Sequence, residues 1–323
     1  MRKRVWLKRT ALVAGALAAL LLFGVLPYAL AGLVSFRKVR YQDRENAGVT
    51  PASFQVPFED VAFRAQDGVE LKGWWVPAAA GRGTVVLVHG LNRSRLEMVR
   101  KVPFVHEQGW NALLFDLRHH GDSGGSACSF GYFERRDVQA AVAYARERAP
   151  GAVVLWGVSL GAAASMLAAA EDPSIAGIVC DSSFRSLRDT ARHHLGLLRS
   201  ARWWLAALPA GLLADEAVFW MGRRVGFDPT AVDVEAAAAR LSGRPALFVC
   251  NSGDRRMPPK IAEALRIAAG EQARLLVVPG DTHGGAYRNG TAAYQTAVIQ
   301  VLEAARGAVP AGAAPVQFSR SRP

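Results

Sequence analysis

The chain has 323 residues, of which 51% are hydrophobic, and a formal net charge of +12. Without an N-terminal segment and a C-terminal tail, about 270 residues remain, a usual size for one α/β domain with an insertion. The basic residues are scattered and form no stripe interleaved with aromatic residues, which argues against nucleic acid as a partner. Two explanations of the positive charge stay open. The charge could attract the protein to anionic membrane lipids, or it could reflect an arginine-rich composition that serves no partner.

The N-terminus has the pattern of a membrane segment. Residues 1–9 are rich in Lys and Arg, and residues 11–36 carry no charge, which exceeds the roughly 20 residues that a helix needs to cross a bilayer. Pro27 could kink this helix, and Ala29-Leu30-Ala31 resembles a signal-peptidase site. We expect an uncleaved single-pass anchor, with secretion after cleavage as the alternative. The denser positive cluster before the span favours an inside N-terminus and an extracytoplasmic domain, joined by a linker at 37–53.

Short apolar runs and helical stretches then alternate along the chain. This pattern predicts an α/β fold, a doubly wound and mostly parallel sheet covered on both faces. Two earlier segments, 54–64 and 69–76, are joined through Asp67-Gly68, a hairpin signal, and should form an antiparallel edge. Six parallel strands, apolar throughout as doubly buried strands should be, are expected to begin at Thr84, Asn111, Ala152, Ile175, Pro245 and Ala273.

Gly157-Val158-Ser159-Leu160-Gly161 lies between one of these strands and an alanine-rich helix. A serine between two glycines at such a junction predicts a nucleophile elbow. The tight turn strains the serine backbone, and glycine at both flanks avoids collisions with neighbouring chain. The alternative is an ordinary strand-to-helix turn.

A serine nucleophile needs a base and an acid, which follow it in the order acid, then histidine. Of seven histidines, only His283 follows the serine and lies near the end of the chain, in a glycine-rich loop after the last strand. Asp254 follows the preceding strand and is the candidate to orient His283. Asp281 and Asp181 are rivals, and Asp254 could also be a plain turn residue.

An oxyanion hole needs two backbone N–H donors. Leu160, directly after the serine, should supply one. Leu91 should supply the other, from the loop that follows the strand at Thr84. In this loop we expect His89, with Gly90, to hold the backbone by a hydrogen bond and not to touch substrate.

The elbow and three further motifs resemble those of the α/β-hydrolase superfamily, and the resemblance covers about residues 54–305. Besides the elbow, His89-Gly90 is similar to its oxyanion turn, residues 116–124 to its D-x-R-x-x-G-x-S-G loop and residues 67–74 to its D-G-x-x-L-x-G-W hairpin. The particular resemblance is to membrane-anchored bacterial hydrolases near the serine aminopeptidase-like and acylhydrolase branch. It implies a catalytic triad of Ser159, Asp254 and His283. The two arginines in the run 254–258 agree only loosely with the family pattern.

The resemblance also places a helical cap at about residues 182–241. Its apolar residues could bind an acyl group and exclude water, or pack the cap onto the domain. The aromatic candidates for substrate binding are Trp203, Trp204, Phe219 and Trp220, of which Trp203 and Trp204 could instead lie in a membrane interface. Residues 307–323, rich in Ala, Pro and Gly, are expected to be a disordered tail.

The implied function is a serine hydrolase that cleaves an ester or thioester of an apolar acyl substrate, through an acyl-enzyme and without metal or organic cofactor. A serine peptidase and a non-catalytic membrane-tethered binding module are the alternatives. Three cysteines without metal-like spacing indicate no disulfide framework. The pairs His119-His120 and His193-His194 are expected to be solvated or capping residues and not metal ligands. The oligomeric state is left open.

Overall fold

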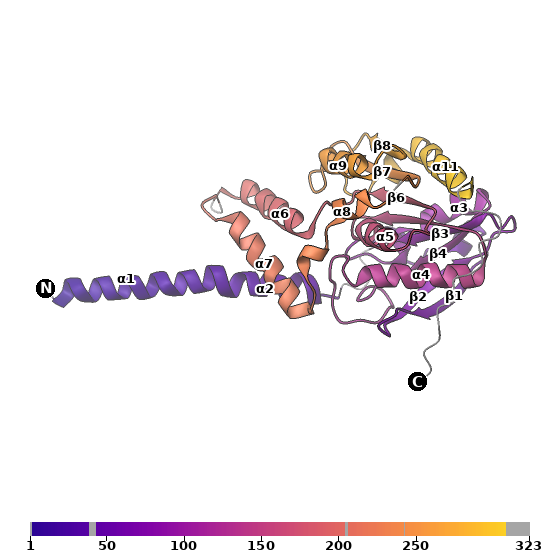
Figure 1. Cartoon of the computed structure of the whole chain (residues 1–323). Coiled ribbons are helices and arrows are strands. Elements are labelled where there is room, and N and C mark those ends of the chain that lie inside the picture. The colour runs from indigo at the N-terminus through magenta and orange to yellow at the C-terminus, as the bar shows by residue number, and fades with distance from the viewer. Residues whose placement is uncertain (1, 39–42, 204–205, 242, 308–323) are drawn as a thin grey trace.

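An eight-stranded sheet forms the centre of the computed structural model, which describes residues 2–38, 43–203, 206–241 and 243–307 (Figure 1). The strand order is β1-β2-β4-β3-β5-β6-β7-β8. The strands are β1 (Glu59–Arg64), β2 (Glu70–Val76), β3 (Gly83–Val88), β4 (Asn111–Phe115), β5 (Ala152–Val158), β6 (Gly177–Asp181), β7 (Ala246–Asn251) and β8 (Ala273–Val278). β1 and β2 are paired antiparallel, β2 is antiparallel to β4, and all later pairs are parallel. The predicted parallel sheet with an antiparallel N-terminal edge is confirmed.

Two strands differ from the prediction. The first was expected from Phe54, but Pro51–Phe54 form a 3₁₀ turn whose capping box joins Thr50 and Ser53, and β1 begins at Glu59. The last was expected to be buried throughout, but β8 is the edge of the sheet and its middle residues are partly exposed. An edge strand has a neighbour on one side only, so helices shield it less completely.

Helices cover both faces of the sheet. On one face lie α4 (Glu134–Arg148), α5 (Leu160–Glu171), α8 (Val234–Ala239) and α9 (Pro259–Ala269); on the other lie α3 (Val102–Glu107) and α11 (Thr291–Gly307), with α10 (Ala286–Asn289) beside α11. Side chains alternate between these layers along each strand. In β5, Leu155 packs into the first layer and Trp156 into the second.

A long N-terminal helix projects from this domain (Figure 1). It consists of α1 (Arg2–Leu20), a π-helical turn η1 (Leu21–Val25) and α2 (Leu26–Phe36). Pro27 has no N–H for the helical ladder, and the wider π turn directly before it accommodates the missing bond without a break. Residues Lys3–Phe36 are long and apolar enough to cross a membrane, a test that a signal sequence also passes.

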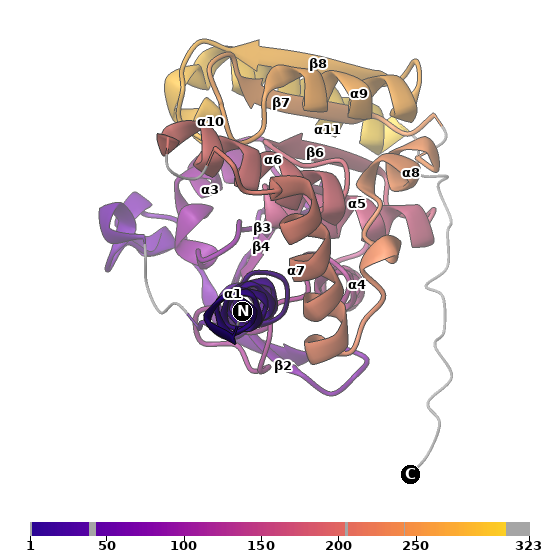
Figure 2. The same cartoon turned by 90° about the vertical axis from the view of Figure 1, so that its left-hand side faces the viewer.

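The cap contains α6 (Leu187–Ala201) and α7 (Ala210–Val225). These two helices pack on each other, and α7 also packs on α2. Seen along the axis of α1, the cap helices lie in front of the sheet and beside the N-terminal helix (Figure 2).

The segment expected as a linker contacts the domain where the structure describes it. The carboxylate of Asp43 is buried and accepts hydrogen bonds from the Arg93 guanidinium, at 2.9 Å, and from the backbone N–H of Ser94, at 3.2 Å. The tail expected from residue 307 falls, apart from Gly307 at the end of α11, outside the described residues.

Candidate active site

Ser159 occupies a strained turn between β5 and α5. Its backbone angles are φ 52° and ψ −112°, in a region that residues other than glycine rarely adopt. A Cβ at Gly157 would lie 2.5 Å from the backbone N of Ala162, and a Cβ at Gly161 would collide with the carbonyl oxygens of Val88 and His89. Both flanking glycines are therefore required by close backbone contacts, which is the physical reason for the G-x-S-x-G spacing.

His283 and Asp254 lie in line with this serine. The Nε2 atom of His283 is 2.9 Å from the Ser159 Oγ atom, and its Nδ1 atom is 2.8 Å from the Asp254 Oδ2 atom. The histidine belongs to the loop between β8 and α10, and the aspartate follows β7. The structure thus brings together the three residues that the sequence singled out, with the ring in position to move a proton to or from Ser159.

The second oxygen of Asp254 fixes the orientation of its carboxylate. Oδ1 accepts hydrogen bonds from the backbone N–H groups of Arg256, at 2.9 Å, and Met257, at 3.0 Å. Burial acts to raise the pKa of Asp254, but the hydrogen bonds from His283 and these amides outweigh burial and hold the pKa below its usual value. The carboxylate is therefore ionised at neutral pH and accepts the Nδ1–H of His283.

Neither rival aspartate contacts the histidine ring through a recorded hydrogen bond among the described residues. Asp281 is exposed and accepts a hydrogen bond from the hydroxyl of Thr282. Asp181 is fully buried at the end of β6, where it accepts hydrogen bonds from the hydroxyls of Ser182 and Tyr294. Its carbonyl oxygen accepts the backbone N–H of Ser159, so Asp181 supports the elbow from below.

His89 holds the loop that faces the serine. Its Nε2 atom accepts the backbone N–H of Leu117 at 3.0 Å, so the ring proton must be on Nδ1, which donates to the carbonyl of Gly90 at 2.7 Å. Burial keeps the pKa of His89 well below its usual value, and the neutral ring makes both bonds. His89 therefore links the backbone at Gly90 to the backbone at Leu117.

The loop also contains a carboxylate that sequence reasoning missed. Glu97 accepts the backbone N–H of Gly90 at 2.6 Å. A Cβ at Gly90 would lie 3.3 Å from this carboxylate and 3.5 Å from the Cβ of Ser159, so Gly90 lies directly against the serine. Burial raises the pKa of Glu97. No short motif contains this residue, because the contact depends on how the loop folds back.

Leu91 and Leu160 carry the two amides expected to form the oxyanion hole. Neither N–H donates a recorded hydrogen bond within the part of the chain that the structure describes. Leu160 begins α5, so its N–H has no partner within the helix and lies at the positive end of the helix dipole. Leu91 directly follows Gly90, which contacts the serine. A role for these two amides as the oxyanion hole stays a prediction.

The hairpin at residues 67–74 and the loop at residues 116–124 are joined by ion pairs and hydrogen bonds at the edge of the sheet. Arg118 donates to Asp67 of the hairpin, at 2.7 Å, and to Asp137 of α4, at 2.7 Å. Burial raises the pKa of Asp137 to about 7, against the opposing effect of Arg118. The hydroxyl of Ser123 donates to the Asp116 carbonyl and accepts the N–H of Lys72. These residues have structural roles and lie in no contact with the serine.

A pocket of about 560 Å³ opens beside His283. Its lining includes the charged residues Glu45, Glu97, Arg100, Lys101 and Arg288, together with Tyr287. Burial lowers the pKa of Lys101, whose ammonium lies over the rings of Trp156 and Tyr287, 5.7 and 5.1 Å from their centroids.

The cap aromatics do not line this pocket. Trp203 and Phe219 are exposed, and Trp220 packs edge-on against Tyr28 of α2, with 5.3 Å between ring centroids. Trp204 lies outside the described residues. The role of the cap aromatics in binding an acyl group stays a prediction.

A cap histidine approaches the site instead. His193 contacts the carbonyl of Arg255 at 2.8 Å, which ties α6 to the loop of Asp254. Burial, with a contribution from the positive charge of Arg256, lowers the pKa of His194 to about 4. The Nε2 atom of His194 is buried and has no hydrogen-bond partner among the described residues.

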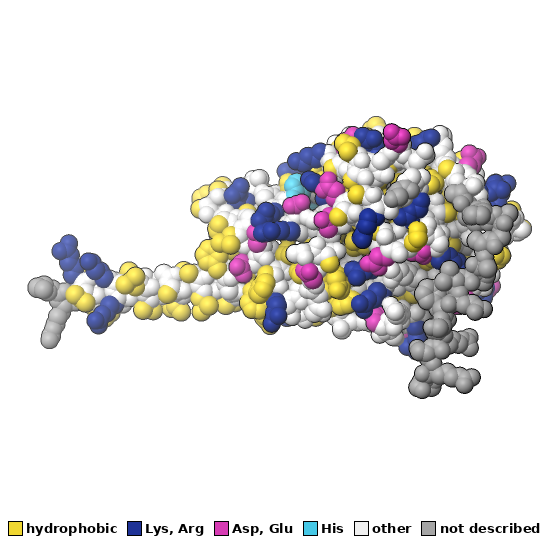
Figure 3. All heavy atoms as spheres, viewed as in Figure 1, with side chains coloured by type: hydrophobic (Ala, Val, Ile, Leu, Met, Phe, Trp, Pro, Cys, Tyr) yellow, Lys and Arg dark blue, Asp and Glu magenta, His cyan; other side chains and the backbone are white. Residues whose placement is uncertain are grey.

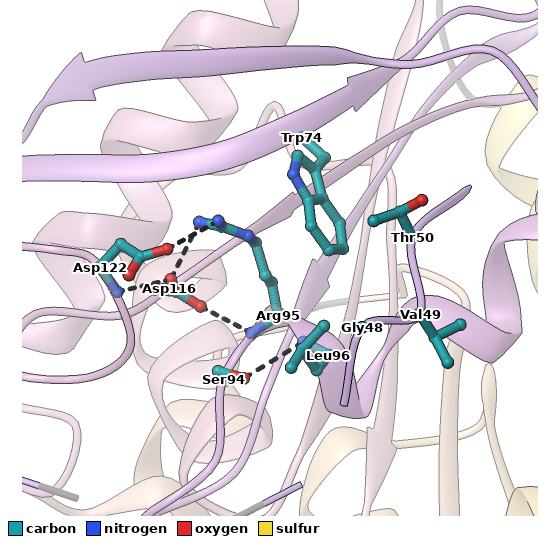
Figure 4. Close-up of a pocket in the computed structure, with 9 residues that line it drawn as sticks. All are labelled: Gly48, Val49, Thr50, Trp74, Ser94, Arg95, Leu96, Asp116 and Asp122. Atoms are coloured by element: carbon teal, nitrogen blue, oxygen red, sulfur yellow. Dashed lines mark hydrogen bonds and ion pairs between the residues drawn. The ribbon is translucent and has the colours of Figure 1, made fainter. Parts of the chain in front are cut away.

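A second, smaller pocket of about 210 Å³ lies elsewhere on the domain (Figure 4). Arg95 lies within it, 4.7 Å from the ring centroid of Trp74, and is paired with Asp116 and Asp122 at 3.0 and 2.9 Å. None of Ser159, Asp254 and His283 lines this pocket. The paired charges hold the loops at 94–96 and 116–122 together.

The chain has the α/β-hydrolase fold. Residues 79–218 match the family described as serine aminopeptidase, S33. Protein YfhR of Salmonella typhimurium is 27% identical over 299 residues, which cover 85% of this chain and 90% of that protein, and YqkD of Bacillus subtilis is 24% identical over 240 residues, 73% and 76% of the two chains. The Pyrococcus furiosus esterase Pf2001 superposes with a TM-score of 0.67 and 22% identity, over 83% of this chain and 97% of that one.

Among the described residues, no group of three or more His, Cys, Asp or Glu side chains could hold a metal ion. Cys128, Cys180 and Cys250 are buried and unpaired. Burial raises the pKa of each of these thiols, to about 11 for Cys250.

Proposed function

We propose that this protein is a serine hydrolase that cleaves carboxylic ester bonds, with Ser159 as nucleophile, His283 as general base and acid, and Asp254 as the residue that orients His283. The observation that carries the proposal is the unbroken line of short contacts from Ser159 Oγ through both ring nitrogens of His283 to Asp254. The strained backbone at Ser159 and the similarity to esterases of the same fold support it.

In the first half of the reaction, Nε2 of His283 takes the proton of Ser159 while Oγ bonds to the ester carbonyl carbon. The carbonyl oxygen becomes an anion beside the N–H groups of Leu91 and Leu160. Removing one such donor typically costs about 3–4 kcal/mol of transition-state stabilisation. The ester C–O bond then breaks, and Nε2 returns its proton to the departing alcohol oxygen, which leaves an acyl-enzyme.

In the second half, a water molecule gives a proton to Nε2 and its oxygen bonds to the acyl carbon. The bond to Oγ breaks, the carboxylic acid is released, and Nε2 returns the proton to Ser159. Asp254 stays ionised throughout, because its hydrogen bonds keep its pKa low, and it stabilises the imidazolium formed in each half.

A peptidase with specificity for a free amino group is the second candidate, because the matched family is named for serine aminopeptidases. Such an enzyme needs a carboxylate near His283 to bind the amine. The pocket beside His283 contains three acidic residues, Asp43, Glu45 and Glu97. Asp43 is paired with Arg93, Glu45 with Arg288, and Glu97 accepts the N–H of Gly90. Because each already has a partner, this pocket favours the esterase.

A fluorophosphonate probe, which labels activated serines, tests the proposal. We expect wild-type protein to be labelled and Ser159→Ala to be unlabelled. Ser165→Ala is the matched control, since Ser165 is buried in α5 and its hydroxyl has no partner among the described residues. Absence of label on the wild type, or label on Ser159→Ala, would show that Ser159 is not the nucleophile. Rates with p-nitrophenyl esters and aminoacyl anilides then compare esterase with peptidase.

We also propose that the N-terminal helix is kept as a membrane anchor. Ala31 and Ser35 of α2 are fully buried, and the carbonyl of Ser35 accepts the backbone N–H of Cys128 at 2.8 Å. Cleavage after Ala31 would remove Tyr28, whose carbonyl accepts a hydrogen bond from Arg224 at 2.9 Å and whose ring lies 4.2 Å from the same guanidinium. A mature mass that begins after Ala31 would refute retention.

A further inference from the structure

The cap carries a concentration of exposed hydrophobic side chains. Outside the N-terminal helix, the large hydrophobic residues that are exposed among the described residues are Leu198, Trp203, Leu212 and Phe219 of the cap, with Ile267 and Val277 elsewhere. Trp203 is 88% exposed. We call the four cap residues the cap tip. Figure 3 shows hydrophobic side chains on the cap and on the adjoining N-terminal helix.

The cap is attached to the N-terminal helix. α7 packs along α2 and also contacts η1, at residues 21–25. Trp220 lies against Tyr28, and Arg224 lies between the rings of Tyr28 and Phe36, 4.2 and 5.1 Å from their centroids. The position of the helix in a bilayer therefore fixes the position of α7.

The length of the apolar run determines that position. Residues 11–36 are uncharged, and about 20 of them suffice to cross the hydrocarbon core. Every such stretch within residues 11–36 contains residues 17–30, and hence all of η1. The stretch that begins at residue 11 ends near Tyr28 and Arg224, which places an aromatic ring and a guanidinium at the lipid interface, where both are favoured. With any choice of stretch, α7 contacts a part of the helix that lies within the bilayer.

The cap carries an excess of positive charge, which favours contact with an anionic lipid surface. Residues 187–226 contain six arginines and three acidic residues. Arg199, Arg202 and Arg223 are exposed, and Arg202 directly precedes Trp203. Exposed apolar residues flanked by arginine are the pattern of an interfacial membrane contact.

We propose that the cap tip is a second membrane contact, inserted among lipids with anionic head groups beside the anchor. The proposal rests on the retained anchor proposed above. It gives the exposed tryptophan and leucines of the cap an apolar environment, and it holds the cap, which is tied to the loop of Asp254 through His193, at the lipid surface. An ester substrate would then reach the site from the bilayer.

Labelling at single introduced cysteines tests the contact in the full-length protein. The native cysteines are buried, so a nitrobenzoxadiazole dye is attached at L212C on the cap tip, at L17C in the anchor and at I267C on α9. Ile267 is 61% exposed and Leu212 50%, which makes them a matched pair. The proteins are placed in vesicles of phosphatidylcholine and phosphatidylglycerol that contain a spin-labelled lipid as quencher.

We expect loss of dye fluorescence at positions 17 and 212 and none at 267. If the dye at position 17 is quenched and the dye at position 212 is not, the cap contact is wrong and the anchor stands. If the dye at position 212 is blue-shifted but not quenched, the cap tip contacts a second copy of the chain, and the proposed lipid contact is wrong. Absence of quenching at position 17 would also overturn the proposal, because the anchor would then lie outside the bilayer. Fluorophosphonate labelling of the same samples reports on Ser159 separately, so failure of the proposed activity is distinguishable.

Discussion

Replacement of Asp254 by asparagine gives the sharpest test of the proposed triad, because the surrounding structure dictates how the new amide must lie. Oδ1 faces two backbone donors, the N–H groups of Arg256 and Met257, at 2.9 and 3.0 Å. The amide oxygen must take this position, so the NH₂ group faces Nδ1 of His283. Nδ1 then has to accept, its proton moves to Nε2, and the ring can no longer take a proton from Ser159.

The size of the effect follows from these contacts. Turning the amide the other way forfeits two hydrogen bonds, each worth about 1 kcal/mol, so at most about 3% of molecules hold the productive orientation. Wrong-tautomer variants of such triads lose about 10⁴-fold in kcat, or about 5 kcal/mol. We expect D254N to lose at least about 30-fold in kcat for a p-nitrophenyl ester, by the two-bond argument, with the unfolding transition still cooperative.

Asp281→Asn is the matched control, since Asp281 is two residues from His283 in sequence but exposed, and bonded to Thr282. It should keep wild-type kcat. If D254N retained most of its activity, or if both variants lost it equally, the assignment of Asp254 as the orienting acid would be wrong.

Three further predictions concern the supports of the site. Gly161→Ala should abolish fluorophosphonate labelling and destabilise the fold by about 3 kcal/mol or more in urea unfolding, because the added methyl group would collide with two backbone carbonyls. Gly211→Ala, which has open space around it, should do neither. Equal unfolding midpoints for the two variants would contradict the steric argument. Arg118→Met should cost about 3–5 kcal/mol, since it leaves Asp137 buried without its partner, whereas the exposed pair of Arg188 with Asp215 predicts an unchanged midpoint for Arg188→Met. The depressed pKa of His194, about 4, means that the unfolded chain binds a proton below about pH 6.5 while the folded chain does not. Stability should therefore fall as the pH drops from about 6.5 to 4, and His194→Phe should flatten that slope in thermal unfolding scans; identical slopes would rule out a buried neutral His194.

Much of the fold was predictable because the type of each element and the burial of its side chains are encoded in short stretches of sequence. Alternating apolar and helical segments predicted the parallel sheet, and the Asp67-Gly68 turn predicted the hairpin. The two misjudged strand segments show the limit of such patterns. Whether the residues from 273 onward form a central or an edge strand depends on the order of strands in space, which no local run of residues encodes.

The candidate site divides in the same way. Ser159 and His283 could be located from the sequence because glycine spacing and chain order constrain them. Glu97, Lys101 and His194 could not, since each reaches the site from an element whose own sequence looks ordinary. The cap aromatics show the same limit: an apolar residue in a cap has several surfaces available to it, and only packing decides which one it covers.

By itself, the sequence determined an α/β sheet, an elbow serine, a downstream aspartate and histidine, and an apolar N-terminal segment long enough to cross a membrane. The tertiary structure alone decided that Asp254, and neither Asp281 nor Asp181, contacts His283, and that α2 packs on the cap helix α7. The physical reason is that hydrophobic periodicity and turn chemistry act over a few residues, whereas a hydrogen bond between residues 29 positions apart, or a helix packed on another from the far side of the sequence, depends on how the whole chain folds.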